Sequence, residues 1–309
     1  MTPETVRFQS DGVTCEGWHF AATSDVLASA AGRPCVVMAH GLAGTRDSGL
    51  QPFAEALSEA GMDVLAFDYR GFGTSGGSPR QVVSMAAQRD DYRAALRAAA
   101  SLVGVDTERL ALWGVSMSGG HVLAVAAGRD DLAAVVAVAP LVDGLAAARH
   151  AVGRHPASQM LRATARGIGA RTLSTVGREP LMMPVVAPPG EVGAFTLPGA
   201  QEAYFSIAGP AWRNEVNASV TTELGTRLPL RKAADITCPV LVQITDLDRS
   251  APPQAAAKAA VRARARVHHY PADHFDVFPG SAWHEPVVED QVLFLAEVLA
   301  PAGSPVHHA

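Results

Sequence analysis

The sequence predicts an α/β protein with a mostly parallel β-sheet that helices cover on both faces. Short apolar runs alternate with segments of helical periodicity along most of the 309 residues, which is typical of repeated strand-helix-strand units. The runs are apolar without interruption, as expected for strands buried on both faces. Hydrophobic residues make up 48% of the chain and charged residues 18%, so there is enough apolar material for a large core.

The elements follow one another in a regular order. Residues 6–9 and 14–20 are expected to form two antiparallel strands, because a polar turn with Gly12 separates them. Buried strands are predicted at residues 34–39, 62–67, 110–113 and 133–139, and two further strands at residues 239–244 and 267–270. Helices are predicted at residues 52–60, 82–103, 252–264 and 283–299, with Asp90 and Asp91 on the solvent side of the second helix.

This alternation stops after Asp143 and resumes at residue 237. The stretch between them is rich in proline and contains apolar pieces of helical character, but no comparable strand. A structureless loop of that length would be unusual in a compact domain. We therefore predict an inserted, mainly helical lid at residues 144–236, on a core formed by residues 1–143 and 237–309. The alternative is an ordinary pair of helices that cover the sheet and are accompanied by a long loop.

One turn carries a candidate nucleophile. The run at residues 110–113 breaks at Gly114, presents the hydroxyl of Ser116 and continues into an apolar helix. In a nucleophile elbow, G-x-S-x-G, a serine stands on such a strand-to-helix turn, with helix amides directed at the reacting atom. The fifth position of the motif is here Ser118, followed by two glycines. The alternative interpretation is a Gly/Ser-rich turn that only enters a buried helix.

A serine hydroxyl is a weak nucleophile, so it needs a base and an acid that orients the base. His274 follows the strand predicted at residues 267–270, and Asp248 follows the strand predicted at residues 239–244. Because the carboxyl ends of parallel strands converge at one edge of a sheet, both side chains can reach Ser116. The chain order Ser, Asp, His is the order expected for a nucleophile elbow of this architecture.

Other residues compete for the roles of acid and base. Asp246 and Asp143 are the competing acids, and the Asp-Arg pair at residues 248–249 favours Asp248 over Asp246. His268 and His269 lie within a strand pattern, so we expect them to be structural or exposed.

These residues together resemble an α/β-hydrolase over nearly the whole chain outside the insertion. The resemblance rests on His40-Gly41, Asp68-Tyr69-Arg70-Gly71, the elbow, and the loops that carry Asp248 and His274. It implies that the backbone amides of Leu42 and Met117 form an oxyanion hole, and that His40 braces the oxyanion loop. Epoxide hydrolases and haloalkane dehalogenases of this fold carry an acid at the nucleophile position, and Ser116 argues against both.

Within the superfamily, the stretch Tyr69-Arg70-Gly71-Phe72-Gly73 resembles esterases and serine peptidases related to prolyl oligopeptidase and the Xaa-Pro dipeptidyl peptidases. The chain is short for those peptidases and shows no propeller, so ester hydrolysis ranks first. The predicted function is cleavage of a carboxylic ester with an apolar portion, through an acyl-enzyme at Ser116. A peptidase, thioesterase or acyltransferase with the same residues is the alternative, followed by a non-catalytic ligand-binding protein.

Composition argues against other partners. A net charge of −5 and a pI near 6.1 do not suit a nucleic-acid binder. The one basic cluster is interpreted as a solvated edge: Arg262, Arg264 and Arg266. The cysteines lack metal-ligand spacing and are expected to be buried thiols: Cys15, Cys35 and Cys238. We expect no metal and no cofactor.

The N-terminal residues lack the apolar region of a signal peptide, and no apolar run is long enough to span a bilayer. We therefore expect a cytoplasmic protein without a membrane partner. Residues 301–309 are expected to form a frayed tail.

Overall fold

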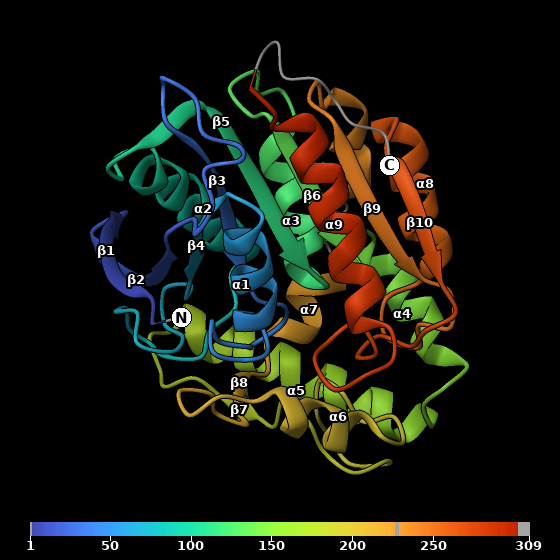
Figure 1. Ribbon diagram of the computed structural model, residues 1–309. Helices are drawn as coiled ribbons and strands as arrows, with labels where there is room; N and C mark the ends of the chain where they lie inside the picture. Colours follow the sequence, from blue (N-terminus) through green and yellow to red (C-terminus); the bar gives the residue numbers. More distant parts are fainter. Residues whose placement is uncertain (1, 226–228, 302–309) are drawn as a thin grey trace.

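The computed structural model describes residues 2–225 and 229–301 (Figure 1). Residues 302–309, most of the tail predicted to be frayed, lie outside the described residues. The centre of the molecule is an eight-stranded sheet with the strand order β1-β2-β4-β3-β5-β6-β9-β10. Its strands are β1 (Glu4–Ser10), β2 (Val13–Phe20), β3 (Arg33–Ala39), β4 (Asp63–Phe67), β5 (Val105–Val115), β6 (Ala134–Val138), β9 (Val240–Thr245) and β10 (Arg266–Tyr270).

Only the β1-β2 and β2-β4 pairs of this sheet are antiparallel; the other neighbours run parallel. In the register of the sheet, Ala39 of β3 lies opposite Gly114 of β5, which lies opposite Ala137 of β6. The parallel strands therefore end at one edge, and the loops that follow them start side by side. The predicted mostly parallel sheet is confirmed.

Both faces of the central strands are buried, which explains their uninterrupted apolar sequences. Successive residues of β3 enter two different cores, because side chains alternate across a sheet. Val37 packs in the core that also contains Leu112, whereas Val36 packs in the core with Trp113.

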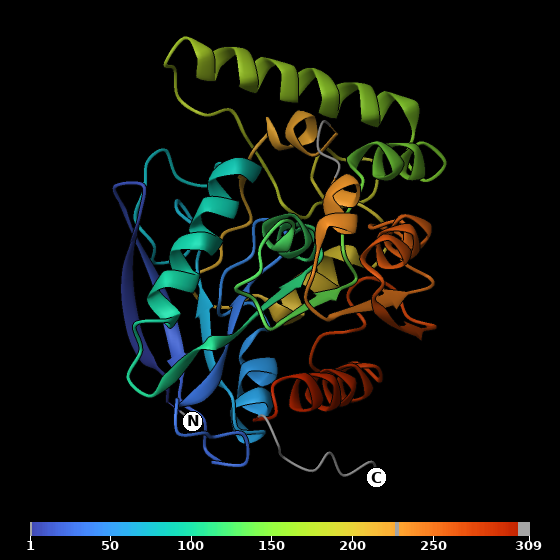
Figure 2. The same ribbon diagram turned by 90° about the horizontal axis from the view of Figure 1, so that it is seen from above.

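Helices cover each face of the sheet. Figure 2 shows α1 (Gln51–Glu59) and α9 (His284–Val298) on one face, and α2 (Met85–Ala99), α3 (Met117–Ala126) and α8 (Pro253–Ala263) on the other. The contacts of α1 with α9 and of α2 with α3 agree with this layering.

The segment predicted as a lid contains a long helix, α5 (Ala157–Thr175), and several shorter elements: α4 (Gly144–Val152), β7 (Met182–Met183), α6 (Ala200–Ile207), β8 (Val216–Asn217), α7 (Val220–Gly225) and the 3-10 helix η1 (Pro229–Asp235). In Figure 1, α4, α5, α6 and α7 gather at the end of the sheet toward which the arrow of β5 points. The helix η1 packs instead against α3 and α8. The segment predicted as a lid thus approaches the edge at which the candidate site residues were predicted.

The prediction that Asp90 and Asp91 both lie on the solvent side of α2 is wrong for Asp91. Asp90 is exposed, but Asp91 is fully buried and accepts hydrogen bonds from the backbone and the guanidinium of Arg70, in the loop after β4. Helical periodicity alone does not reveal a buried carboxylate whose partner comes from another part of the chain. The helix is also shorter than predicted, since it begins at Met85 and ends at Ala99.

Two further predictions concern cysteine and arginine side chains. Cys15 and Cys35 are buried thiols as predicted, but Cys238 is only partly buried, because it lies just before β9 begins at Val240. The three arginines predicted to form a solvated edge are exposed: Arg262, Arg264 and Arg266. Within the described residues, no helix is long and apolar enough to cross a membrane.

Candidate active site

Ser116 occupies a strained turn between β5 and α3. Its φ of 59° and ψ of −120° lie outside the regions that non-glycine residues ordinarily adopt. The turn is held from both sides, since the Ser116 amide donates to the Val138 carbonyl and the Leu141 amide donates to the Ser116 carbonyl, each at 2.8 Å. Strain of this kind costs about 1 to 3 kcal/mol and persists only where the surroundings enforce it. The serine is thereby lifted off the end of the sheet.

Gly114 allows this turn to close. A Cβ at this position would lie 2.3 Å from the carbonyl oxygen of Ser118, in the first turn of α3. Replacing Gly114 by Ala should therefore lower the free energy of unfolding by at least about 2 kcal/mol, because backbone has to move. Urea unfolding followed by circular dichroism measures this change.

Gly153→Ala is the matched control. Gly153 ends α4 with a φ of −80°, and no atom lies within 4 Å of the position of its Cβ. Its replacement should change the free energy of unfolding by no more than about 0.5 kcal/mol. If Gly114→Ala and Gly153→Ala lowered the free energy of unfolding equally, the result would contradict the close packing around Gly114.

The predicted nucleophile, base and acid meet in one hydrogen-bonded series. The Oγ atom of Ser116 lies 2.9 Å from Nε2 of His274. The other ring nitrogen of His274, Nδ1, lies 2.7 Å from Oδ2 of Asp248. All three side chains are buried, although they come from three loops that are far apart in the sequence.

Asp248 is fixed by further hydrogen bonds. Its Oδ1 accepts from the amides of Ser250 and Ala251 at 2.7 and 2.6 Å, and its Oδ2 accepts from the Thr245 hydroxyl at 2.8 Å. A buried carboxylate that accepts several hydrogen bonds is held in one orientation. The carboxylate therefore faces Nδ1 of His274 in a defined position.

The competing acids lie elsewhere. Asp246 contacts His269 at 2.8 Å on the outside of the sheet. Asp143 accepts from the amide of Ala146 and caps the N-terminus of α4. The structure thus brings Asp248, and neither alternative, to His274.

Two opposing effects act on the pKa of His274. Burial lowers it, because the charged imidazolium is poorly solvated there, but the charge of Asp248 and its hydrogen bond raise it and outweigh burial. The pKa of His274 is therefore above its ordinary value. A base with this pKa accepts a proton from a hydroxyl more readily than an ordinary histidine does.

The loop after β3 passes directly over Ser116. A Cβ on Gly41 would lie only 3.1 Å from the Cβ of Ser116, so the loop passes close to the serine and leaves little room for a side chain at this position. Leu42 follows and lines the cavities beside Ser116. Met117, which carries the other predicted oxyanion amide, is the first residue of α3, and the amides of a first helical turn have no partner within the helix.

His40 lies behind this loop. Its Nδ1 atom lies 2.9 Å from the Gly41 carbonyl oxygen, and burial lowers the pKa of His40 to about 4. A neutral imidazole that donates to the carbonyl fits this environment. The contact agrees with the predicted bracing role and leaves His40 outside the Ser116, His274 and Asp248 series.

Two residues of the insertion that the sequence did not single out as site residues also hold the loop. The Tyr204 hydroxyl donates to the Leu42 carbonyl at 2.9 Å, and Nε1 of Trp212 donates to the Ala43 carbonyl at 3.1 Å. Their rings stack with centroids 5.0 Å apart. In the sequence these two residues show only an aromatic side chain with one polar atom, because their partners lie more than 160 residues earlier in the chain.

Hydrogen bonds and an ion pair to Asp273 also join the loop that carries Asp248 to the loop that carries His274. Arg249 donates its backbone amide to Oδ1 of Asp273 at 2.9 Å, and the amide of His274 donates to the same oxygen at 2.8 Å. The Arg249 guanidinium also forms an ion pair with Asp273. The spacing between the two candidate residues is therefore set by their immediate neighbours.

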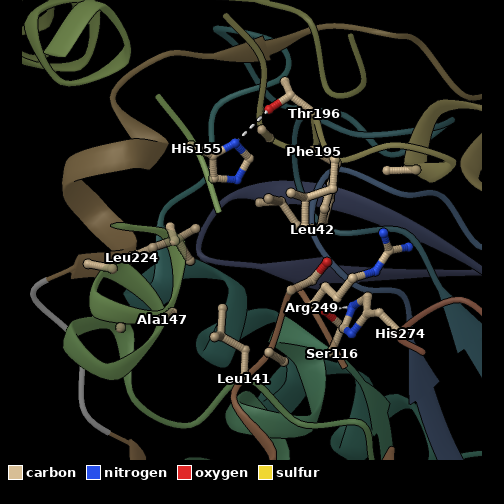
Figure 3. A pocket seen from close by; sticks show the side chains of 18 of the residues that line it. Leu42, Ser116, Leu141, Ala147, His155, Phe195, Thr196, Leu224, Arg249 and His274 are labelled. Atoms are coloured by element: carbon tan, nitrogen blue, oxygen red, sulfur yellow. Dashed lines mark hydrogen bonds between the residues drawn. The ribbon is translucent and has the colours of Figure 1, made fainter. Parts of the chain in front are cut away.

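A cavity of about 220 Å³ opens beside Ser116 (Figure 3). Most of its lining is apolar and comes from the loop after β6, from α4, from the loop around Phe195 and from α7; examples are Leu141, Ala147, Ala151, Phe195 and Leu224. Arg249 lies at one side, and His155 and Thr196 lie opposite. A second cavity of about 30 Å³ lies on the other side of Ser116, against the His40–Leu42 loop.

Comparisons with known proteins agree with this architecture. A family model described as serine aminopeptidase, S33, matches residues 30–176. The chain is 35% identical to the quorum-quenching protein AidA of Acinetobacter baumannii (strain MDR-ZJ06) over 302 residues, which cover 97% of this chain and 96% of that protein. It is 28% identical over 280 residues to the thiohydrolase aneE of Aspergillus aculeatus, with 86% of each chain covered. The crystal structure of the α/β hydrolase GrgF from Penicillium sp. sh18 superposes with a TM-score of 0.78, at 24% identity, over 97% of this chain and 99% of that one.

The sheet order and the similarity along nearly the full length define an α/β protein of the hydrolase type. The chain belongs to the α/β-hydrolase superfamily, as its motifs predicted, and the comparisons support hydrolase activity.

Proposed function

We propose that the protein is a serine hydrolase that cleaves carboxylic esters. Ser116 is the nucleophile, His274 is the base and then the acid, and Asp248 orients His274. The observation that carries the proposal is the 2.9 Å separation between Oγ of Ser116 and Nε2 of His274, with Asp248 on the far ring nitrogen. This is the geometry that proton transfer from a serine requires.

The reaction runs in two steps. Oγ of Ser116 attacks the ester carbonyl carbon while its proton passes to Nε2 of His274, and the amides of Leu42 and Met117 bind the resulting oxyanion. Collapse of the tetrahedral intermediate expels the alcohol, which takes the proton from His274 and leaves an acyl-enzyme. Water then attacks the acyl-enzyme while His274 takes its proton, and collapse of this second intermediate returns that proton to Oγ of Ser116 and releases the carboxylic acid.

The larger cavity favours an uncharged, apolar acyl group. Its lining is mainly alanine, leucine and phenylalanine, and none of the described residues that line it is Asp or Glu. A peptidase that binds a free amino terminus needs a negative partner for the ammonium group, since a buried cation without one is costly. The cavity therefore suits an ester better than a peptide with a free amino terminus, in spite of the description of the family model.

A thioester is the second candidate. It shares the acyl half of an ester, and one relative carries the name thiohydrolase. A thiol is also more acidic than an alcohol, so a thiolate leaves with less help from His274. Matched oxygen and thioesters of one acyl chain would rank the two substrates.

The test is hydrolysis of p-nitrophenyl esters of increasing acyl length. We expect activity that rises with acyl length until the larger cavity is filled, and a kcat in Ser116→Ala that is lower by about 10,000-fold or more. In Ala147→Phe, which narrows the cavity from α4, kcat/KM for the longer esters should fall by about tenfold relative to the shortest.

Ala165→Phe on the exposed side of α5 is the control and should keep the length profile of the native protein. An unchanged profile in Ala147→Phe would place the acyl chain elsewhere. Failure of the native protein to hydrolyse any ester, with thioesters cleaved, would favour the second candidate.

A further inference from the structure

Ser118 stands where the nucleophile elbow usually has glycine, and its side chain is fully buried. Its hydroxyl donates to the carbonyl oxygen of His40. Because the hydroxyl has one proton, the Tyr69 hydroxyl, 2.5 Å away, must donate to Ser118. The ring of Tyr69 packs against the ring of His40, with centroids 4.9 Å apart. The hydroxyl of Ser118 thus connects α3 to the loop after β3.

These two segments carry the two proposed oxyanion amides. Ser118 directly follows Met117 in the first turn of α3, and His40 lies two residues before Leu42. The strands that precede them are neighbours, with Ala39 opposite Gly114. One hydrogen bond therefore spans the gap between the two halves of the proposed oxyanion hole.

The loop depends on contacts from outside itself. Ala43 has a φ of 52°, a left-handed conformation that non-glycine residues adopt at a cost. The Leu42 carbonyl of this loop accepts a hydrogen bond from Tyr204, and the Ala43 carbonyl accepts one from Trp212. The Ser118 bond holds the same loop from the side of the nucleophile and joins it directly to α3.

The geometry points to Ser118 as a positioning residue that fixes the distance between the Leu42 and Met117 amides. The proposal rests on the proposed function and deepens it: the serine at the fifth position of the motif aligns the oxyanion hole. Oxyanion stabilisation depends strongly on donor position, since loss of one donor costs about 100-fold to 1,000-fold in kcat. Partial misalignment should cost less than that.

Ser118→Ala should lower kcat for a p-nitrophenyl ester by about 30-fold and leave KM within about twofold. The affinity for a trifluoromethyl ketone with the same acyl group should fall in parallel with kcat. The hydroxyl oxygen of Ser116 adds to the carbonyl carbon of that ketone, and the hydroxyl proton passes to His274. The ketone oxygen becomes an oxyanion that accepts hydrogen bonds from the same two amides. Ser118→Gly, which restores the usual motif residue, should show the same losses because it also lacks the hydroxyl.

Ser58→Ala is the matched control. Ser58 is fully buried in α1, and its hydroxyl donates to the Ala21 carbonyl at 2.7 Å, so the variant removes a similar bond away from both cavities. Both variants should lose stability to urea, but only the Ser118 variants should lose kcat and ketone affinity. Native-like kcat in Ser118→Ala, with an active native protein, would overturn the positioning role alone. An inactive native protein whose Ser116 does not react with a phosphonate would overturn the proposed function and this role together.

Discussion

Ser116→Ala should lower kcat for a p-nitrophenyl ester by about 10,000-fold or more. Alanine removes the only atom that can form the acyl-enzyme and leaves the cavity and the proposed oxyanion amides in place. Substrate binding should therefore persist, and the small remaining rate should reflect attack by water. Steady-state kinetics with highly purified protein measure the loss, and the absence of an initial burst of p-nitrophenol confirms that no acyl-enzyme accumulates.

The double variant Ser116→Ala, His274→Ala provides the internal test of this prediction. Residues that act as one unit are strongly non-additive, so the double variant should be no more than about tenfold slower than the single variant. Ser58→Ala again serves as a serine control with native kcat. A Ser116→Ala protein that retained a tenth of the native kcat would contradict the assignment of Ser116 as nucleophile.

Asp248→Asn should lower kcat by about 1,000-fold to 10,000-fold and change its pH dependence. His274 must be neutral to accept the proton of Ser116, so activity is lost as the pH falls through the pKa of His274. Because Asp248 raises that pKa, the native protein should lose activity at a pH above the ordinary histidine value of about 6.5. Removing the charge of Asp248 should move this loss to lower pH. Profiles of kcat/KM from about pH 5 to about pH 9 measure the shift.

Asp246→Asn separates this effect from a general change of charge. Asp246 lies two residues earlier in the same loop and contacts His269 instead of His274. Its replacement should leave both kcat and the pH profile close to those of the native protein. A large shift in Asp246→Asn, with none in Asp248→Asn, would mean that the acid has been assigned to the wrong carboxylate.

The sequence alone was sufficient to predict which candidate site residues lie together, where those residues follow the ends of strands. Ser116, Asp248 and His274 each follow an apolar run, and a parallel sheet brings such positions to one edge. The distances between their side chains in the structure agree with that expectation. The boundaries of most strands were also predictable, because both of their faces are buried.

Contacts between distant segments were not predictable in the same way. The hydrogen bonds from Tyr204 and Trp212 to the loop after β3 depend on how the segment predicted as a lid folds back over the sheet. Asp91 was misplaced for a related reason, since its partner Arg70 lies outside the helix. Ser118 was visible as a departure from the motif, but its partner His40 became visible only in the folded chain.

The most direct test of the central claim is reaction with a fluorophosphonate, followed by intact mass and peptide mass spectrometry. We predict that the native protein gains one phosphonyl group on Ser116, that Ser116→Ala gains none, and that His274→Ala reacts far more slowly because the hydroxyl has lost its base. Ester hydrolysis by a native protein that is not labelled, or that is labelled at another residue, would contradict the claim that Ser116 is a nucleophile activated by His274.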